Sequence, residues 1–322
     1  MIREPYLLTK LDWHRIIESS LILLAHHGAT MTQFSFGGDW TEQKLAILRQ
    51  YLPAYATIMK KHAAKFRYAY IDAFAGTGYR LLKQDENPEQ LVFPEFGESP
   101  QASLDGSARI ALKVDPPFDR YIFIEKDETR YKELLKLKLE FENLKDRIQI
   151  ENADANAYLG NLLNRNWTQH RAVLFLDPFG MQVPWTTVEA IARTQAIDMW
   201  YLFPIGIGVN RLLKKDGQIH EKWVDRLDLT FGERGWFDAF YQITVEKGLF
   251  GEEKQTLKIS DFESIGRYFV RRLETIFPGV AQNPRLLYNS RNNPMFLFCF
   301  AAANKQGAKT AVKIVEDILA RP

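Results

Sequence analysis

The stretch Ile71-Asp72-Ala73-Phe74-Ala75-Gly76-Thr77-Gly78 decides how this chain folds. It continues an apolar, β-prone run that begins at Tyr68, so it predicts a buried strand that ends in a carboxylate. Glycine has no Cβ, and a turn through Gly76 and Gly78 therefore lets the backbone approach a ligand closely. A lone Gly-x-Gly is common by chance, and its weight here comes from the strands that follow.

Three later β-prone runs also end in acidic side chains. They are Arg120 to Glu125, Arg147 to Asp154 and Ala172 to Asp177. Near-continuous apolar runs of this kind are typical of parallel strands that are buried on both faces of a sheet. Each run therefore predicts another strand with a carboxylate at its carboxyl end.

Helical stretches separate these strands, including Glu128 to Asn143 and Thr186 to Thr194. Strands that alternate with helices predict an open, doubly wound α/β sheet. Such sheets bind ligands outside the carboxyl ends of their strands. We therefore expect four acidic residues to face one crevice: Asp72, Glu125, Asp154 and Asp177.

Composition fits an enzyme with one large core. The 322 residues carry a net charge of +2, which gives no global attraction to nucleic acid, although a local basic patch is compatible with it. The single cysteine, Cys299, excludes an intrachain disulfide, and the six histidines show no metal-ligand spacing, so we expect no metal site. No apolar stretch approaches the roughly 20 residues that span a bilayer, and a cytoplasmic location is expected.

The order of these motifs resembles that of class I S-adenosylmethionine-dependent methyltransferases. The chain is more specifically similar to the three-Cys-motif partner protein family, through phrases that cover roughly residues 34 to 319. The phrases are Tyr51-Leu52-Pro53-Ala54-Tyr55, Ile71 to Gly78, Leu176-Asp177-Pro178-Phe179-Gly180-Met181-Gln182 and Phe203-Pro204-Ile205-Gly206-Ile207-Gly208-Val209-Asn210. The resemblance implies a Rossmann-like methyltransferase sheet, mostly parallel, with a terminal antiparallel hairpin. It also implies a partner protein that carries a three-cysteine motif.

The resemblance implies that S-adenosylmethionine is the cofactor. The turn that contains Phe74, Gly76 and Gly78 would admit its methionine part, with Asp72 near the ammonium. Glu125 has two acceptor oxygens for the two ribose hydroxyls, and Asp154 could accept from the adenine amino group. Taken singly, each carboxylate is better explained as a solvated or capping group, and the four in this order favour the cofactor site.

Asp177-Pro178-Phe179-Gly180 is the candidate catalytic loop. Asp177 and the Pro178 carbonyl would hold an acceptor amine, and Phe179 would stack on a base. Amino-methyltransferases usually carry a second proline before the aromatic residue, and the form here instead resembles the tRNA guanine-N2 dimethyltransferases. The alternative is an ordinary structural turn after a buried strand.

The expected substrate is therefore an amino nitrogen of a nucleic-acid base, with DNA, RNA and protein left open. Candidate substrate-binding residues are Gly180, Asn210, Arg211 and Arg291. The alternative function is a non-catalytic methyltransferase-fold module that serves as a scaffold for its partner. The oligomeric state is left open.

Four blocks are expected along the chain. Residues 1–33 form an N-terminal extension, which could be an added helix or precede a true start at Met31. Residues 34–206 form the first part of the core, and the long loop 79–107 within it is either a lid or disordered. Residues 207–260 are a helical insertion, and residues 261–322 complete the core with a capped helix, a hairpin and a closing helix.

Overall fold

The computed structural model describes residues 40–76, 106–248 and 251–321. Gly37–Pro322 forms one compact unit. The expected extension (1–33) and Gly78 lie outside the described residues, as does nearly all of the loop expected at 79–107.

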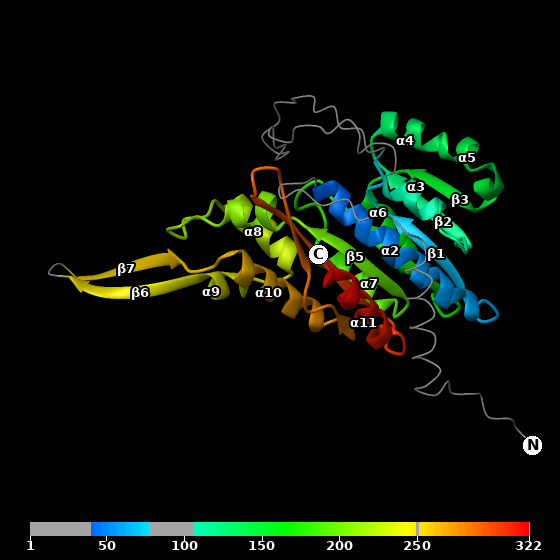
Figure 1. Ribbon diagram of the computed structural model, residues 1–322. Helices are drawn as coiled ribbons and strands as arrows, with labels where there is room; N and C mark the ends of the chain where they lie inside the picture. The colour runs from blue at the N-terminus through cyan, green and yellow to red at the C-terminus, as the bar shows by residue number, and fades with distance from the viewer. Residues whose placement is uncertain (1–39, 77–105, 249–250, 322) are drawn as a thin grey trace, which may run out of the picture. The chain divides into compact units, whose positions relative to one another are not determined.

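A single eight-stranded sheet forms the centre of this unit (Figure 1). Five strands run parallel to one another, as the apolar runs predict. They are β1 (Arg67–Asp72), β2 (Arg120–Glu125), β3 (Ile148–Asn152), β4 (His170–Leu176) and β5 (Ile197–Phe203). The strand order is β3-β2-β1-β4-β5-β10-β8, so the chain reverses its direction of travel between β1 and β4, which is the switch point of a doubly wound sheet. The predicted fold class is confirmed.

The last three strands close one side of the sheet in antiparallel fashion. They are β8 (Gly279–Val280), β9 (Arg285–Tyr288) and β10 (Pro294–Ala302). β10 is antiparallel to both β5 and β9, so β9 runs in the same direction as β5. The turn at residues 289–293 between β9 and β10 therefore lies at the carboxyl edge of the parallel strands, as expected.

Helices cover both faces of the sheet (Figure 1). On one face pack α2 (Trp40–Lys61), α3 (Ser107–Leu112) and α11 (Ala308–Leu319). On the other face pack α6 (Ala155–Leu163), α7 (Trp185–Arg193) and α10 (Phe262–Glu274). Side chains that alternate along each strand feed the two cores, because successive residues of a strand point to opposite faces. Tyr70 belongs to the first core and Ile71 to the second.

Pro53 lies inside α2, which continues on both sides of it; Tyr51 and Ala56, on either side, are both buried. One helix prediction needs correction. The helix expected at 128–143 divides into α4 (Glu128–Leu135), α5 (Leu137–Glu140) and the 3₁₀ turn η1 (Glu142–Arg147). Leu139 is 83% exposed, so the apolar residues beyond α4 do not continue one buried face.

The insertion expected to be helical is helical only in its first half. It begins in the π-helix η2 (Ile205–Asn210) and continues through α8 (Glu221–Phe231) and α9 (Trp236–Phe240). Residues 241–258 instead form β6 (Tyr241–Gly248) and β7 (Gly251–Lys258), a separate two-stranded antiparallel sheet (Figure 1). The consecutive β-branched residues Ile243, Thr244 and Val245 in β6 favour a strand over a helix and were the missed signal.

Candidate active site

Strand register brings the four predicted carboxylates to one edge of the sheet. Asp72, the last residue of β1, is level with Phe123 on β2 and Phe175 on β4. Glu125 and Asp177 each lie two residues beyond that level on the neighbouring strands. Asp154 likewise lies two residues beyond Asn152, the β3 partner of Glu125.

Asp72 is fully buried and holds the turn that follows β1. Its Oδ1 accepts from the Phe74 backbone N–H at 3.3 Å, and its Oδ2 accepts from the Ser107 hydroxyl at 2.6 Å. Burial raises the pKa of Asp72 to about 7; the Asp177 carboxylate adds to the rise, and the Ser107 hydrogen bond and Lys44 oppose it. Asp72 therefore ties β1 to the start of α3 within the described structure.

The glycine turn and Glu125 form a cradle. A Cβ placed on Gly76 would stand 3.5 Å from Glu125 Oε2, so glycine leaves room directly beside this carboxylate. Glu125 is only 5% exposed, and its Oε1 accepts from the Asp127 backbone N–H at 2.8 Å. Burial raises the pKa of Glu125, against the effects of that hydrogen bond and of Arg130. The second carboxylate oxygen thus lies beside Gly76, and the Arg130 side chain reaches the same place, with its Cδ 3.8 Å from that Cβ position.

Asp154 serves as the N-cap of α6. Its Oδ1 accepts from the backbone N–H groups of Asn156 and Ala157 at 3.1 and 3.2 Å. Its Oδ2 lies 3.4 Å from Lys126 Nζ. Asp154 therefore caps α6, as one of its two expected roles requires. Its contact with adenine stays a prediction.

Asp177 is paired with Lys44, a residue that the sequence analysis missed. Lys44 Nζ donates to Asp177 Oδ2 at 2.5 Å, and the two side chains are 7% and 17% exposed. The same ammonium lies 4.4 Å from the centre of the Trp40 ring, a cation–π distance. The signal was present in the sequence: Lys44 is a lysine on the apolar face of α2, four residues before buried Leu48.

The residues after Asp177 present an aromatic ring at the surface. Pro178 is buried, whereas Phe179 is 38% exposed. The guanidinium of Arg130 lies 5.1 Å from the Phe179 ring, and the Phe179 backbone N–H donates to Gln182. Gly180 has a φ of 72°, a conformation that favours glycine and lets the loop turn back. Arg130 thus contacts the ring of a partly exposed Phe179, and Gln182 holds its backbone.

The motif from Phe203 to Asn210 includes the π-helix η2 (Ile205–Asn210). Its two glycines, Gly206 and Gly208, lie closely against neighbouring segments. A Cβ on Gly206 would stand 1.9 Å from the Pro294 carbonyl oxygen, and one on Gly208 would stand 2.6 Å from Met181 Cγ. η2 therefore packs between the loop that follows Asp177 and the start of β10. Its last residue, Asn210, accepts from Lys258 Nζ at 2.6 Å.

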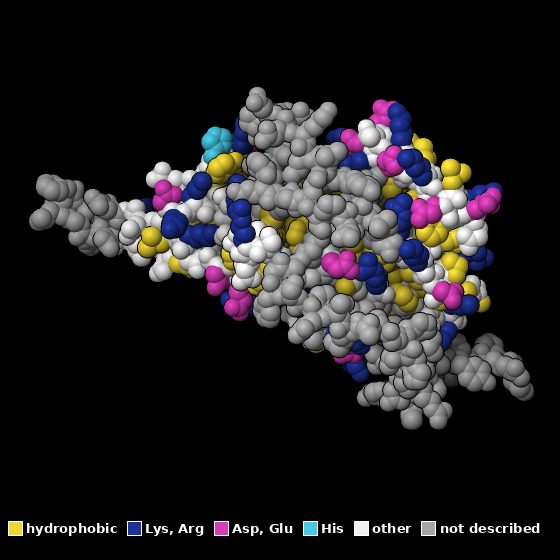
Figure 2. Space-filling model, turned by 45° about the horizontal axis from the view of Figure 1, so that its top comes forward, with side chains coloured by type: hydrophobic (Ala, Val, Ile, Leu, Met, Phe, Trp, Pro, Cys, Tyr) yellow, Lys and Arg dark blue, Asp and Glu magenta, His cyan; other side chains and the backbone are white. Residues whose placement is uncertain are grey.

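The two predicted substrate arginines are both exposed. Arg211 follows η2 directly, and Arg291 lies in the turn between β9 and β10, where its backbone N–H donates to the Asn289 side chain. Lys and Arg side chains are intermixed with Asp and Glu on the described part of the face in Figure 2. The described residues of that face thus offer local cationic positions rather than one broad basic surface.

The described residues contain neither a membrane-spanning helix nor a cluster of metal-binding side chains. Within residues 40–76, 106–248 and 251–321, no helix is long and apolar enough to cross a membrane. In those same ranges no group of three or more His, Cys, Asp or Glu side chains could hold a metal ion.

Comparison with known proteins yields weak structural likeness alone. No protein-family model and no curated protein matches the chain. A protein from Legionella pneumophila str. Philadelphia 1 is 15% identical, with a TM-score of 0.44 over 88% of this chain and 92% of that one. A methyltransferase from Geobacter sulfurreducens is 14% identical, with a TM-score of 0.28 over 79% and 92%. An O-methyltransferase from Bacillus cereus in complex with SAH is 11% identical, with a TM-score of 0.32 over 78% and 92%. Likeness at this level carries no argument about activity.

Proposed function

We propose that this protein is an S-adenosylmethionine-dependent methyltransferase that acts on an amino nitrogen of a nucleic-acid base. The observation that carries the proposal is the convergence of Asp72, Glu125, Asp154 and Asp177 at the carboxyl edge of a doubly wound sheet, beside the glycine turn. Buried carboxyls with raised pKa values, here Asp72 and Glu125, are candidates for a functional site when they lie at such an edge.

The residues at the edge fit this cofactor. Glu125 Oε2 lies beside Gly76 and would accept from ribose hydroxyls. Asp72 and the Phe74 to Gly76 turn would lie against the methionine part, and Asp154 would lie near the adenine. When bound, the cofactor would supply an activated methyl group on a sulfonium cation. Four carboxylates at this edge suit a ligand that carries net positive charge.

Asp177 and the Pro178 carbonyl would position the acceptor nitrogen. Lys44 donates to Asp177 Oδ2, and Asp177 Oδ1 would accept from an N–H of the incoming amine. The ion pair thus fixes the orientation of the Asp177 carboxylate. Phe179, held by Arg130, would stack on the base, a contact that contributes roughly 1–3 kcal/mol per base. Positioning of this kind is a main source of rate acceleration, and effective molarities correspond to roughly 7–11 kcal/mol.

Arg211 and Arg291 would meet phosphates on either side of the base. Two exposed arginines are a small footprint for a polyanion, because each phosphate contact contributes only part of the affinity. The proposal therefore includes a partner protein with a three-cysteine motif, which would supply further contacts to the nucleic-acid substrate.

A scaffold function is the second candidate, and the Lys44–Asp177 pair favours it. The pair already satisfies one oxygen of the carboxylate that an acceptor amine would need. In that case the protein would bind the cofactor at this edge without transferring its methyl group. The partner protein would then bind differently to the cofactor-bound and cofactor-free forms.

The decisive experiment is transfer of labelled methyl groups to separated DNA, RNA and protein pools, with and without the partner. We expect label in a nucleic-acid pool that disappears with Asp177→Asn. Cofactor binding without label in any pool, even with the partner present, would favour the scaffold. Absence of cofactor binding by calorimetry would contradict both.

A further inference from the structure

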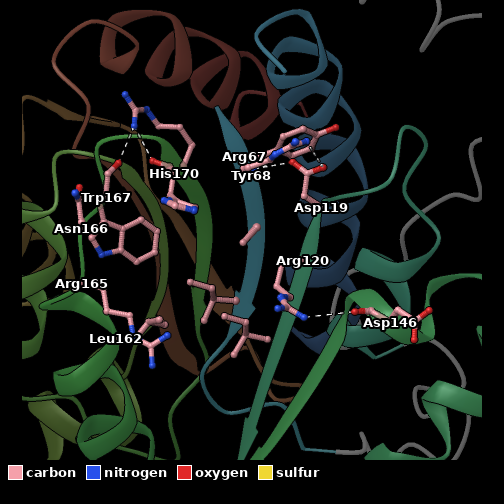
Figure 3. Close-up of a pocket in the computed structure, with 14 residues that line it drawn as sticks. Arg67, Tyr68, Asp119, Arg120, Asp146, Leu162, Arg165, Asn166, Trp167 and His170 are labelled. Atoms are coloured by element: carbon pink, nitrogen blue, oxygen red, sulfur yellow. Dashed lines mark hydrogen bonds and ion pairs between the residues drawn. The ribbon is translucent and has the colours of Figure 1, made fainter. Parts of the chain in front are cut away.

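A second pocket lies at the opposite, amino-terminal edge of the sheet, on the face covered by α6 (Figure 3). It has a volume of about 640 Å³, which is within the range of small-molecule sites. Figure 3 shows Trp167 and Arg165 on one side of it, and Arg67 and Arg120 on the other. None of its lining residues belongs to the carboxyl-edge site.

The pocket exists because α6 is shorter than the strands beneath it. Nine helical residues span about 13 Å, whereas the six residues of β2 span about 20 Å. α6 begins at the carboxyl edge with its cap, Asp154, and therefore ends before it reaches the amino ends of β1 and β2. Apolar side chains form the floor of the pocket: Ala69 is partly exposed, Ile122 and Leu162 are 7% and 6% exposed, and Ile71 lies fully covered beneath them.

Cationic side chains surround this floor. The lining contains four arginines against two aspartates, a formal charge of +2. The aspartates do not neutralise the arginines evenly. Asp119 accepts from the Tyr68 backbone N–H at 3.0 Å and lies 3.8 Å from Arg67 Nη1. Arg120 donates instead to the backbone carbonyl of Asp146 at 3.4 Å, which is a neutral acceptor, and the Asp146 carboxylate points away from Arg120 (Figure 3).

One further donor in the lining, the buried Trp167 Nε1, has no acceptor among the residues that the structure describes. The guanidinium of Arg171 does not face the pocket. Its Nη1 donates to the carbonyls of Trp167, Thr168 and His170, and it lies 3.9 Å from the Phe66 ring, which packs against the core on the α2 face. A buried donor without an acceptor is costly, so Trp167 favours a ligand with an acceptor oxygen over a purely apolar one.

We propose that this amino-edge pocket binds a nucleotide unit, with the base on the apolar floor beside Trp167 and the phosphate between Arg120 and Arg165. Arginine matches phosphate with paired N–H donors, which explains why a phosphate suits this rim. A flat aromatic base suits a floor of small and aliphatic side chains with an indole beside it. The nucleotide unit could come from a free mononucleotide or from a single-stranded nucleic acid, which share this chemistry. The proposal does not rest on methyl transfer.

The test is titration of the full chain with uridine monophosphate, a short single-stranded oligouridylate and inorganic phosphate, followed by calorimetry. We expect both nucleotide probes to bind more tightly than inorganic phosphate. Arg120→Ala and Arg165→Ala should each weaken nucleotide binding by about tenfold or more, since a hydrogen bond to a charged group is lost. Both side chains are exposed, so neither change should prevent folding.

The matched control is Arg267→Ala, which removes an exposed arginine of α10 that pairs with Glu263 outside the pocket. It should leave nucleotide binding unchanged. Trp167→Phe should remove the fluorescence change that accompanies binding, which places the ligand beside this indole. Saturation with S-adenosylhomocysteine should not displace the nucleotide, because the two sites lie at opposite edges of the sheet.

Tighter binding of the oligouridylate than of the mononucleotide, lost in the same variants, would identify the source as a nucleic-acid strand. Equal binding of the two would identify a free nucleotide. Nucleotide affinity that is the same in Arg120→Ala, Arg165→Ala and the wild type would overturn the proposal. So would inorganic phosphate that binds as tightly as the nucleotide, because the floor would then contribute nothing.

Discussion

Lys44 of α2 donates to Asp177 after β4 at 2.5 Å and so joins the helix that precedes β1 to the loop proposed to hold the acceptor. The two residues are 133 positions apart in sequence. Lys44 also lowers the pKa of the neighbouring Asp72, whereas Asp177 raises it. The positive charge of one ammonium therefore stabilises the charged forms of two carboxylates. This arrangement links the stability of α2 on the sheet to the chemistry of the site.

Lys44→Met should destabilise the fold. Removing one partner from a largely buried pair leaves an uncompensated charge, at a cost on the order of 3 kcal/mol. Asp177→Asn should cost less, because Asp72 still faces the lysine. The double variant should lose less than the sum of the two single losses, which urea unfolding of the full cycle would reveal. Additive losses would mean that the pair contributes no coupling.

Stability should fall with rising pH because of Asp198. Burial raises the pKa of this carboxyl from 3.8 to about 7, against the opposing effects of the hydrogen bond from Tyr51 and of Arg171. The folded state therefore favours the protonated acid. Its stabilising contribution is fully present below pH 3.8 and is lost as the pH rises through about 7. The loss is at most on the order of 4 kcal/mol.

Asp198→Asn removes this titration. The difference in unfolding free energy between wild type and variant should therefore change steadily between about pH 4 and pH 7 and stay level above that range. A difference for Asp198→Asn that does not vary with pH would contradict the assignment.

Gly206→Ala should disturb both η2 and the turn that carries Arg291. The new Cβ would stand 1.9 Å from the Pro294 carbonyl oxygen, which is backbone and cannot swing away. We expect a loss of roughly 1–3 kcal/mol, as for other overpacked positions. Gly160→Ala is the matched control, because nothing lies within 4 Å of its Cβ position in α6. It should be neutral or stabilise the protein by up to about 1 kcal/mol. Equal effects in thermal unfolding would contradict the packing explanation.

The sequence predicted the parallel sheet well because each strand is a short apolar run with a carboxylate after it. The residues of such a run favour a strand whatever the rest of the chain does. β2, for example, begins and ends where the pattern predicts. The order of the carboxylates along the chain then predicted the edge at which they meet. Tyr51 and Tyr55, part of a family phrase, prove to be packing residues: Tyr51 donates to Asp198, and Tyr55 stacks on Phe118.

What the sequence did not predict depends on contacts between distant segments. Lys44 meets Asp177 only because α2 packs across the sheet, and Ser107 reaches Asp72 across 35 positions. The β6–β7 hairpin was missed because its residues are mostly exposed, so the alternation of buried and exposed side chains that usually identifies a strand is weak there. Exposed Ile243 and Val245 carry the β preference without burial.

The last prediction separates cofactor binding from transfer. Glu125→Ala should weaken binding of S-adenosylhomocysteine by about 1.5–3 kcal/mol, because the carboxylate oxygen beside Gly76 is proposed to accept from the ribose hydroxyls. Asp177→Asn should leave that affinity nearly unchanged, since Asp177 addresses the acceptor. Asparagine is preferred to alanine at this position because it keeps a carbonyl oxygen for Lys44 and so limits the structural change.

Transfer should show the opposite pattern. Asp177→Asn should lower single-turnover methyl transfer by about 10²-fold or more, as expected when a group that positions the reaction is lost. Glu125→Ala should recover most of its rate at saturating cofactor. Calorimetry and single-turnover assays on the same preparations make the comparison, with Arg267→Ala as an unchanged control. If Asp177→Asn retained the full rate, the loop after β4 would be a structural turn, and Glu125 alone would then mark a cofactor-binding scaffold.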